Sequence, residues 1–247
     1  MTKCLFALAF CFVHYEGFSQ VTGNPEDASA LSIRVLENEN TSHFKAHPNL
    51  YNGPEYIDYS RKYFLKTGHQ FFISDSPQRG TVFYNGRHFP DVNLWYDLVL
   101  DQVVLLHPST SYTPRLVDEH VQSFLIDGRR FLRLVADSAT GKAIQTGYYQ
   151  VLIDSNIQVV AKRVKLISER LEQGNKNADF YSKDRYFLRK NNLYYPIDSK
   201  ASIVKHMADH EKEIQKFIKA NRLGFSKKTR ELDIIELADY YNSLSTE

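Results

Sequence analysis

The sequence is poor in the residues that break or cross-link a chain. Its 247 residues include only 11 glycines, 8 prolines and 2 cysteines. This composition, with 43% hydrophobic residues, excludes collagen-like and disordered chains. The 31 basic and 29 acidic residues nearly cancel, so no global positive field marks a nucleic-acid-binding protein. We therefore expect one or two globular domains with a substantial core and no nucleic-acid partner.

Long apolar runs are also absent. The most apolar segment is a short run near the N-terminus. Lys3 precedes an unbroken apolar run over residues 4–13, and the small-residue triplet Gly17-Phe18-Ser19 follows it. A positive residue, a short apolar run and small residues in this order are typical of a secretory signal peptide. The run is too short for a bilayer-spanning helix, which needs about 20 apolar residues. We predict a signal peptide over residues 1–19 and a mature chain that spans no membrane.

Cysteine is missing from the predicted mature chain, because Cys4 and Cys11 both lie within residues 1–19. Without cysteine the mature protein forms no disulfide, uses no thiol nucleophile and holds no cysteine-ligated zinc or iron–sulfur cluster. Its hydrophobic core must therefore hold the fold together. We expect an exported, disulfide-free protein that is periplasmic or extracellular and uses no cofactor.

The middle of the sequence consists of short apolar or alternating runs separated by turn residues. Asn85-Gly86 and Asp127-Gly128 are two-residue hairpin sequences whose positive φ angles match the twist of paired strands. Repeated hairpins predict a mainly β (α+β) fold, an antiparallel meander that curls into a barrel or a sandwich. We predict a segment of uncertain structure at 20–68, an antiparallel β domain at 69–198 and a helical segment packed on it at 199–247.

The C-terminal part changes to a helical period. Apolar residues recur every three or four positions after the capping residue Ser199, and Gly224 stands where the chain is expected to leave the helix. A second helix is predicted after Ser226, with an apolar stripe of Leu232, Ile235, Ala238, Tyr241 and Leu244. We expect two amphipathic helices that pack against the sheet or against each other.

Charge is spread unevenly in the C-terminal half. Residues 161–190 and residues 200–231 each contain nine basic and four acidic side chains. In the first window the basic residues alternate with apolar ones, as on the solvated face of a strand. We favour that interpretation over a groove for an acidic partner.

Two groups of polar residues have spacings that occur in chemical sites. His206 and His210 are four residues apart in a predicted helix, and Glu213 follows one turn later, which is a spacing compatible with Zn²⁺. His210 also belongs to an apolar stripe, so an ordinary amphipathic helix is favoured and no metal site is expected. Asp97 and Asp101 are a candidate glycosidase pair. Their position in a bend between two strands favours a role in capping backbone N–H groups.

Aromatic residues are the best candidates for contact with a ligand. Tyr51, Tyr56 and Tyr59 crowd a loop-like stretch before the β domain, and Trp95 lies in an alternating strand. Exposed rings of this kind stack on sugar rings or on bases. For the loop residues we favour a different role, in which they fill the open end of a barrel. No catalytic residue is identified from the sequence.

Four short motifs together resemble uncharacterised exported proteins of the Bacteroidota cell envelope. They are the small-residue triplet before Gln20, Asn52-Gly53-x-Glu55-Tyr56, Tyr96-Asp97-x-x-x-Asp101 and Asp239-Tyr240-Tyr241-Asn242-x-Leu244. The resemblance covers most of the chain and implies an envelope or periplasmic setting, but it implies no activity and no catalytic residue.

We therefore expect an exported cell-envelope protein with a non-catalytic binding or accessory role. Its partner would be another envelope protein, a glycan or a lipid, and an aromatic surface at a sheet face would serve as the contact. The alternative is a secreted hydrolase whose acid/base or histidine–metal site assembles only in the fold. A cluster of histidines or carboxylates around one opening favours the hydrolase, and a cavity walled by Tyr and Phe favours binding.

Overall fold

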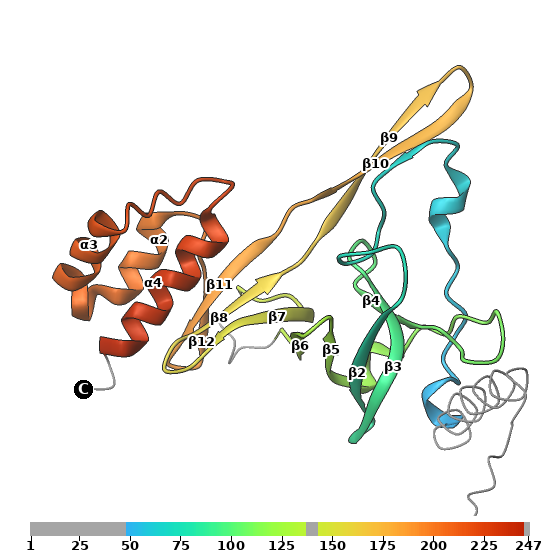
Figure 1. Ribbon diagram of the computed structural model, residues 1–247, viewed down its shortest axis with the longest axis horizontal. Helices are drawn as coiled ribbons and strands as arrows, with labels where there is room; N and C mark the ends of the chain where they lie inside the picture. Colours follow the sequence, from blue (N-terminus) through green and yellow to red (C-terminus); the bar gives the residue numbers. More distant parts are fainter. Residues whose placement is uncertain (1–47, 137–142, 245–247) are drawn as a thin grey trace, which may run out of the picture.

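The computed structural model describes residues 48–136 and 143–244, which form a mainly β structure with helices at the C-terminal end (Figure 1). The strands are β1 (Lys66–Thr67), β2 (Gln78–Tyr84), β3 (Arg87–Asp97), β4 (Gln102–Leu105), β5 (Val121–Ile126), β6 (Arg129–Leu134), β7 (Gly147–Asp154), β8 (Gln158–Lys162), β9 (Lys165–Glu172), β10 (Asn175–Ser182), β11 (Arg185–Lys190) and β12 (Leu193–Pro196). The α-helices are α2 (Lys200–Val204), α3 (Glu211–Ala220) and α4 (Arg230–Leu244). Short 3₁₀-helices are η1 (Pro48–Leu50), η2 (Tyr59–Lys62), η3 (Asp118–His120) and η4 (Lys205–His210).

The predicted signal peptide at 1–19 and both cysteines lie outside the described residues. The part of the chain that the structure describes contains no cysteine. Among its helices, none combines the length and the apolar character needed to cross a bilayer.

Nine strands form one antiparallel sheet in the order β12-β11-β8-β7-β6-β5-β2-β3-β4. The predicted hairpin pairs Asn85-Gly86 (φ 50° and 71°) and Asp127-Gly128 (φ 48° and 71°) form the β2–β3 and β5–β6 turns. Asn191 and Asn192 take the same left-handed conformation between β11 and β12. The predicted antiparallel, mainly β fold is confirmed. The strand order is not sequential throughout, because β5 pairs with β2.

The sheet curls around its own core between β7 and β4. Tyr96 of β3 and Tyr148 of β7 belong to one buried cluster, and their ring centroids lie 5.8 Å apart. These strands are four positions apart in the sheet, which in a flat sheet is about 19 Å at ~4.8 Å per strand. Phe124 and Phe131 stack between them with centroids 4.8 Å apart. Aromatic side chains therefore fill the concave face of a strongly curved sheet.

Closure of this curved sheet into a barrel or a sandwich stays a prediction. Among the described strands, β4 and β12 end the sheet and do not pair with each other. Leu50 and Tyr51 from the N-terminal part pack into the same core cluster as the curled strands.

The helices cover one face of the other end of the sheet. Their buried side chains, among them Ile203, Ile214 and Leu237, pack against residues of β7, β8 and β11. The opposite face of these strands is also buried, around Tyr149 and Val160. β8 is therefore buried along its whole length, which explains why its central residues 159–161 are apolar without alternation.

The first predicted helix is interrupted and ends before Gly224. It divides into α2, η4 and α3, and Met207 leaves helical geometry at φ −118° and ψ 26°. Arg222 takes the left-handed conformation after α3 (φ 56°), and the Leu223 N–H donates to the Ile218 carbonyl at 3.0 Å. This is the hydrogen bond of a Schellman turn. The expectation that Gly224 ends the helix is wrong, because the turn closes two residues earlier.

The buried stripe of α4 differs from the predicted one. Leu232 is 68% exposed, whereas Ile234 and Leu237 are buried. Ala238 and Tyr241 are buried as predicted. Apolar residues lie next to each other along this helix, so two different stripes could face the sheet. Contact with the sheet selects the stripe that contains Ile234 and Leu237.

β9 and β10 form a hairpin that continues β8 and β11 beyond the nine-stranded sheet (Figure 1). Only residues 163–164 and 183–184 separate the two parts of this ribbon. β1 adds to its edge in parallel, with Lys66 opposite Ala178. This hairpin was not predictable from the sequence, because its strands are mostly polar and lack an apolar alternation.

Candidate functional site

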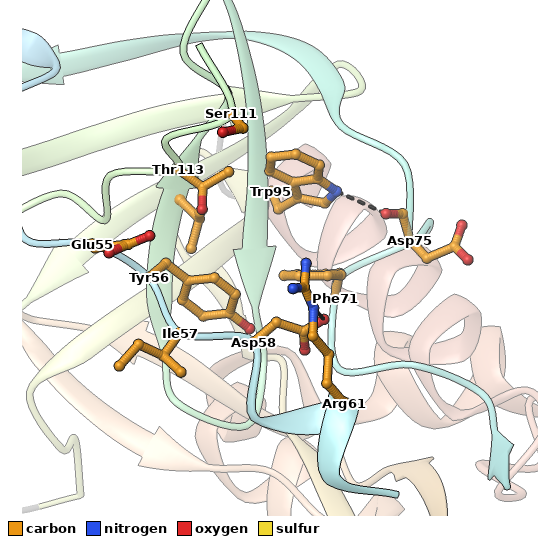
Figure 2. Close-up of a pocket in the computed structure, with 11 residues that line it drawn as sticks. Glu55, Tyr56, Ile57, Asp58, Arg61, Phe71, Asp75, Trp95, Ser111 and Thr113 are labelled. Carbon is orange, nitrogen blue, oxygen red and sulfur yellow. Dashed lines mark hydrogen bonds and ion pairs between the residues drawn. The ribbon is translucent and has the colours of Figure 1, made fainter. Parts of the chain in front are cut away.

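A pocket of about 560 Å³ lies on the outer face of strands β3 and β4 (Figure 2). Trp95 and Val104 are directly opposite each other on these strands, and both line the pocket. Their neighbours Leu94 and Tyr96 point to the other face and into the curled core, since side chains alternate along a strand. The volume is within the range of small-molecule sites.

The N-terminal segment forms one wall of the pocket because it pairs with the chain after β4. The Arg115 N–H donates to the Pro54 carbonyl at 2.9 Å, and the Tyr56 N–H donates to the Thr113 carbonyl at 2.8 Å. Gly53 makes this approach feasible, since a Cβ there would lie 2.0 Å from the Arg115 carbonyl oxygen. The glycine of the Asn52-Gly53-x-Glu55-Tyr56 motif thus positions the wall of the site.

Three aromatic rings form a continuous apolar side of the pocket. Phe71 lies between the other two, with its ring centroid 6.0 Å from that of Tyr56 and 5.8 Å from that of Trp95. The planes of Phe71 and Trp95 are tilted by only 33°. The Trp95 indole N–H donates to the Asp75 carbonyl at 2.8 Å, which fixes the orientation of the ring (Figure 2).

Polar side chains stand beside these rings. Asp58 caps η2 by accepting from the Ser60 N–H (3.0 Å) and also accepts from the Gln70 amide (3.0 Å). Burial acts to raise the pKa of Asp58, but the hydrogen bonds from Ser60 and the charges of Lys66 and Arg61 outweigh it and lower the pKa. Asp58 is therefore ionised at neutral pH and accepts hydrogen bonds. Further polar residues at the pocket are Glu55, Arg61, Asp75, Ser111 and Thr113.

Asp97 lies behind the aromatic side and fixes its geometry. Its carboxylate accepts from the hydroxyls of Tyr56 (2.8 Å) and Tyr59 (3.2 Å). It also accepts from the backbone N–H groups of Val99 (2.8 Å) and Leu100 (3.0 Å), so the predicted capping role in the bend is confirmed. Burial raises the pKa of Asp97. The residue supports Tyr56 without itself lining the pocket.

Asp101 belongs to a separate network. It accepts from the Tyr96 hydroxyl at 2.6 Å and pairs with the buried Lys162 ammonium group. A Cβ at position 147 would lie 2.1 Å from an Asp101 carboxylate oxygen, so Gly147 leaves room for this ion pair. Asp97 and Asp101 therefore do not face each other across a pocket, and they connect different parts of the curled sheet.

Two of the four aromatic candidates line the pocket, namely Tyr56 and Trp95. Tyr51 is buried in the curled core, where its ring makes an edge contact with His107 at 5.4 Å. Tyr59 donates to Asp97 and packs against the cluster of Tyr63 under the β9–β10 hairpin. Whether Tyr51 or Tyr59 contacts a ligand stays a prediction.

Sequence reasoning missed Phe71, Asp58 and Arg61 as pocket residues. Phe71 lies in a short apolar run that is typical of a strand, yet it makes only an isolated bridge to Asp97. Asp58 follows Tyr56 by two residues, and this spacing of an aromatic and an acidic residue was the one signal in the sequence that could have marked Asp58 as a pocket residue. Nothing in the sequence brings these residues beside Trp95.

The histidine candidates for a metal site are not brought together. The His206 ring stacks on Tyr195 with centroids 4.1 Å apart, and the His210 ring meets the edge of Tyr241 at 5.7 Å. Met207 leaves helical geometry between the two histidines, so the i, i+4 spacing of a regular α-helix does not hold there. Glu213 is exposed on α3. Within residues 48–136 and 143–244, no three His, Cys, Asp or Glu side chains are grouped to hold a metal ion.

Comparison with known proteins finds no matching family model, no similar curated protein and no similar solved structure. The geometry of the pocket is therefore the basis for a functional proposal. It combines an aromatic side, an ionised carboxylate, a guanidinium group and hydroxyl groups around one opening.

Proposed function

We propose that this chain is an exported cell-envelope protein that binds a glycan, without catalysis, in the pocket of Tyr56, Phe71 and Trp95. The observation that carries the proposal is the row of three rings beside charged and hydroxyl side chains. A sugar ring has C–H groups on its faces and hydroxyl groups around its rim. Aromatic rings cover the faces, and Asp58, Arg61 and their polar neighbours bind the rim.

A glycan fits this lining better than a lipid chain does. Asp58 and Arg61 stand at the pocket together with Glu55 and the Ser111 and Thr113 hydroxyls. An acyl chain would cover these groups without offering them hydrogen bonds, and that costs free energy. Sugar hydroxyls donate to carboxylates and accept from guanidinium groups.

The setting of this function is the cell envelope, periplasmic or extracellular. The signal-peptide pattern at 1–19 and the resemblance to Bacteroidota envelope proteins support export. The lack of cysteine after residue 11 is compatible with a protein that depends on its core alone. We further propose that the curled part of the sheet is a partly open barrel whose outer wall carries the glycan pocket.

The arrangement of carboxylates supports binding over hydrolysis. A glycosidase needs a carboxylic acid of raised pKa in contact with the glycosidic oxygen. Burial raises the pKa of Asp97, but this group lies behind Tyr56 and is occupied by four hydrogen bonds. Asp58, which does line the pocket, has a lowered pKa.

The proposal is tested by screening the purified protein on a glycan microarray and titrating the strongest binders by calorimetry. Trp95→Ala removes one stacking ring and is expected to weaken binding at least about tenfold. Because Trp95 is half-buried, Arg61→Ala provides a second variant with an exposed side chain, and it should weaken binding without affecting the fold.

Phe64→Ala is the matched control, since Phe64 is 69% exposed and lies outside the pocket. It should bind the glycan as the parent protein does. The proposal fails when no glycan binds, or when all three variants bind equally well. Release of shortened sugars from the bound glycan, followed by chromatography, would contradict the non-catalytic assignment and favour the secreted hydrolase.

A further inference from the structure

A second pocket, of about 660 Å³, lies between the β10–β11 junction and the start of α4. Its lining contains four basic side chains and one acidic side chain, together with a serine and two tyrosines: Lys183, Arg185, Lys227, Arg230, Asp184, Ser182, Tyr181 and Tyr186. None of these residues lines the aromatic pocket. The second pocket therefore has a composition and a place in the fold of its own.

The basic residues of this pocket come from the two positively charged windows of the sequence. Lys183 and Arg185 belong to residues 161–190, and Lys227 and Arg230 belong to residues 200–231. The fold brings the two windows together where α4 packs beside the ribbon. For Lys183 and Arg185 of the first window, this convergence favours the alternative of a groove for an acidic partner over a solvated strand face.

Nearby carboxylates do not neutralise this charge, because a buried arginine already binds them. Arg163 donates to Asp184 at 2.7 Å and makes a two-point contact with Glu231 at 2.6 and 2.8 Å. The Val164 N–H and the Tyr186 hydroxyl donate to the same two carboxylates. One arginine against two carboxylates leaves one negative charge beside four positive ones.

The four basic groups lack acidic partners of their own. Arg185 donates to the Gln145 side chain at 3.1 Å, and none of the four forms an ion pair with any residue that the structure describes. The Nε atom of Arg230 is buried and has no hydrogen-bond partner among those residues. Buried N–H groups are rarely left without an acceptor. A bound anion would offset the repulsion among the four like charges around the pocket.

We propose that this pocket binds a phosphate group. A phosphate offers several anionic oxygens, which match the forked donors of Arg185 and Arg230 and the point charges of Lys183 and Lys227. The Tyr181 and Tyr186 rings border the same space and can contact the group to which the phosphate is attached. The phosphate belongs either to a soluble phosphorylated molecule or to a lipid headgroup, and the two sources share this chemistry.

The test uses the whole protein and two probes. Inorganic phosphate is titrated by NMR, and vesicles of phosphatidylcholine with and without phosphatidylglycerol are assayed by co-sedimentation. Lys183 and Lys227 are both exposed, so Lys183→Gln with Lys227→Gln leaves the core intact. We expect this double variant to weaken binding at least about tenfold, because each lysine that contacts the phosphate supplies a charge-assisted hydrogen bond and even one such bond is worth about that factor.

The matched control is Lys212→Gln with Lys216→Gln, which removes the same charge from the exposed side of α3. It should bind each probe as the parent protein does. Binding of phosphate alone supports the proposal with a soluble ligand, and binding of phosphatidylglycerol vesicles supports it with a lipid headgroup. The proposal is overturned when neither probe binds, or when the two double variants lose binding equally.

Discussion

Arg163 is the residue on which the junction of sheet, ribbon and helix depends. Its side chain is 10% exposed and donates to Gln150 of β7 (2.7 Å), to Asp184 before β11 and to Glu231 of α4. The charge of Arg163 is compensated in place, because all three partners accept from its guanidinium group. One buried side chain therefore connects three elements that are distant in the sequence.

Replacing Arg163 by methionine should lower the free energy of unfolding by about 3 kcal/mol, because two carboxylates lose their buried partner. Arg170→Gln is the control, since Arg170 pairs with Asp179 with half of its side chain exposed. It should cost less than about 1 kcal/mol. Urea unfolding followed by circular dichroism measures both values, and equal effects would contradict the role assigned to Arg163.

Asp97 should make stability depend on pH. Burial raises its pKa above the ordinary 3.8 in the folded protein, so the folded state holds the proton more tightly than the unfolded chain. The stabilisation of the folded state by protonated Asp97 is fully present below the unfolded pKa. It is lost as the pH rises through the folded pKa. The difference in unfolding free energy between parent and Asp97→Asn should therefore fall as the pH rises above the unfolded pKa of 3.8. A difference that stays constant or increases with pH would contradict this assignment.

At the residue scale, sequence reasoning identified some pocket residues and missed others for a physical reason. Tyr56 and Trp95 were candidates because aromatic residues in a loop or an alternating strand are conspicuous. Phe71 became a pocket residue only when its segment paired with β3, and Asp58 only when residues 54–56 paired with the chain after β4. No local pattern encodes that juxtaposition.

At the scale of single elements, the backbone at the end of α3 is strained, and a substitution can relieve this strain. Arg222 holds φ at 56°, a conformation that suits glycine and costs other residues about 1 kcal/mol or more. Arg222→Gly should therefore raise the free energy of unfolding by about 1 kcal/mol, since the Schellman turn stays in place. Arg222→Ala keeps the side-chain carbon and should give no comparable gain. Chemical denaturation of both variants distinguishes them.

The packing of α4 on the sheet gives a second prediction at this scale. Leu237 is fully buried among the helices and strands, whereas Leu232 is 68% exposed. Leu237→Ala should cost about 3 kcal/mol of stability. Leu232→Ala should stay within about 0.5 kcal/mol. Thermal and urea unfolding check both, and a larger effect at Leu232 would restore the stripe expected from the sequence.

Elements with strong local patterns were predictable and those without them were not. Asn85-Gly86 and Asp127-Gly128 specify their turns through residues that accept positive φ, so the hairpins followed directly. The β9–β10 hairpin has the same kind of turn at Gln173 and Gly174, with φ of 50° and 82°. Its strands carry mostly polar side chains, because only one face is partly covered. Apolar periodicity therefore gave no indication of it.

At the scale of the whole molecule, the curled sheet and the helical end carry two separate pockets. The aromatic pocket lies on the outer wall of the curled strands, and the basic pocket lies where the ribbon meets α4. The sequence predicted the antiparallel sheet and the helical end. A curled sheet was also expected from the sequence, but its place was not, because the curvature lies where Tyr96, Phe124, Phe131 and Tyr148 gather on one face.

The aromatic pocket contains the single tryptophan of the chain, Trp95. Its fluorescence therefore reports directly on occupation of this pocket. Titration with the glycan selected by the array should give a saturable change in emission, with a midpoint that agrees with calorimetry and moves to higher concentration in Arg61→Ala. Calorimetric binding without any change in Trp95 emission would place the ligand elsewhere and contradict the account.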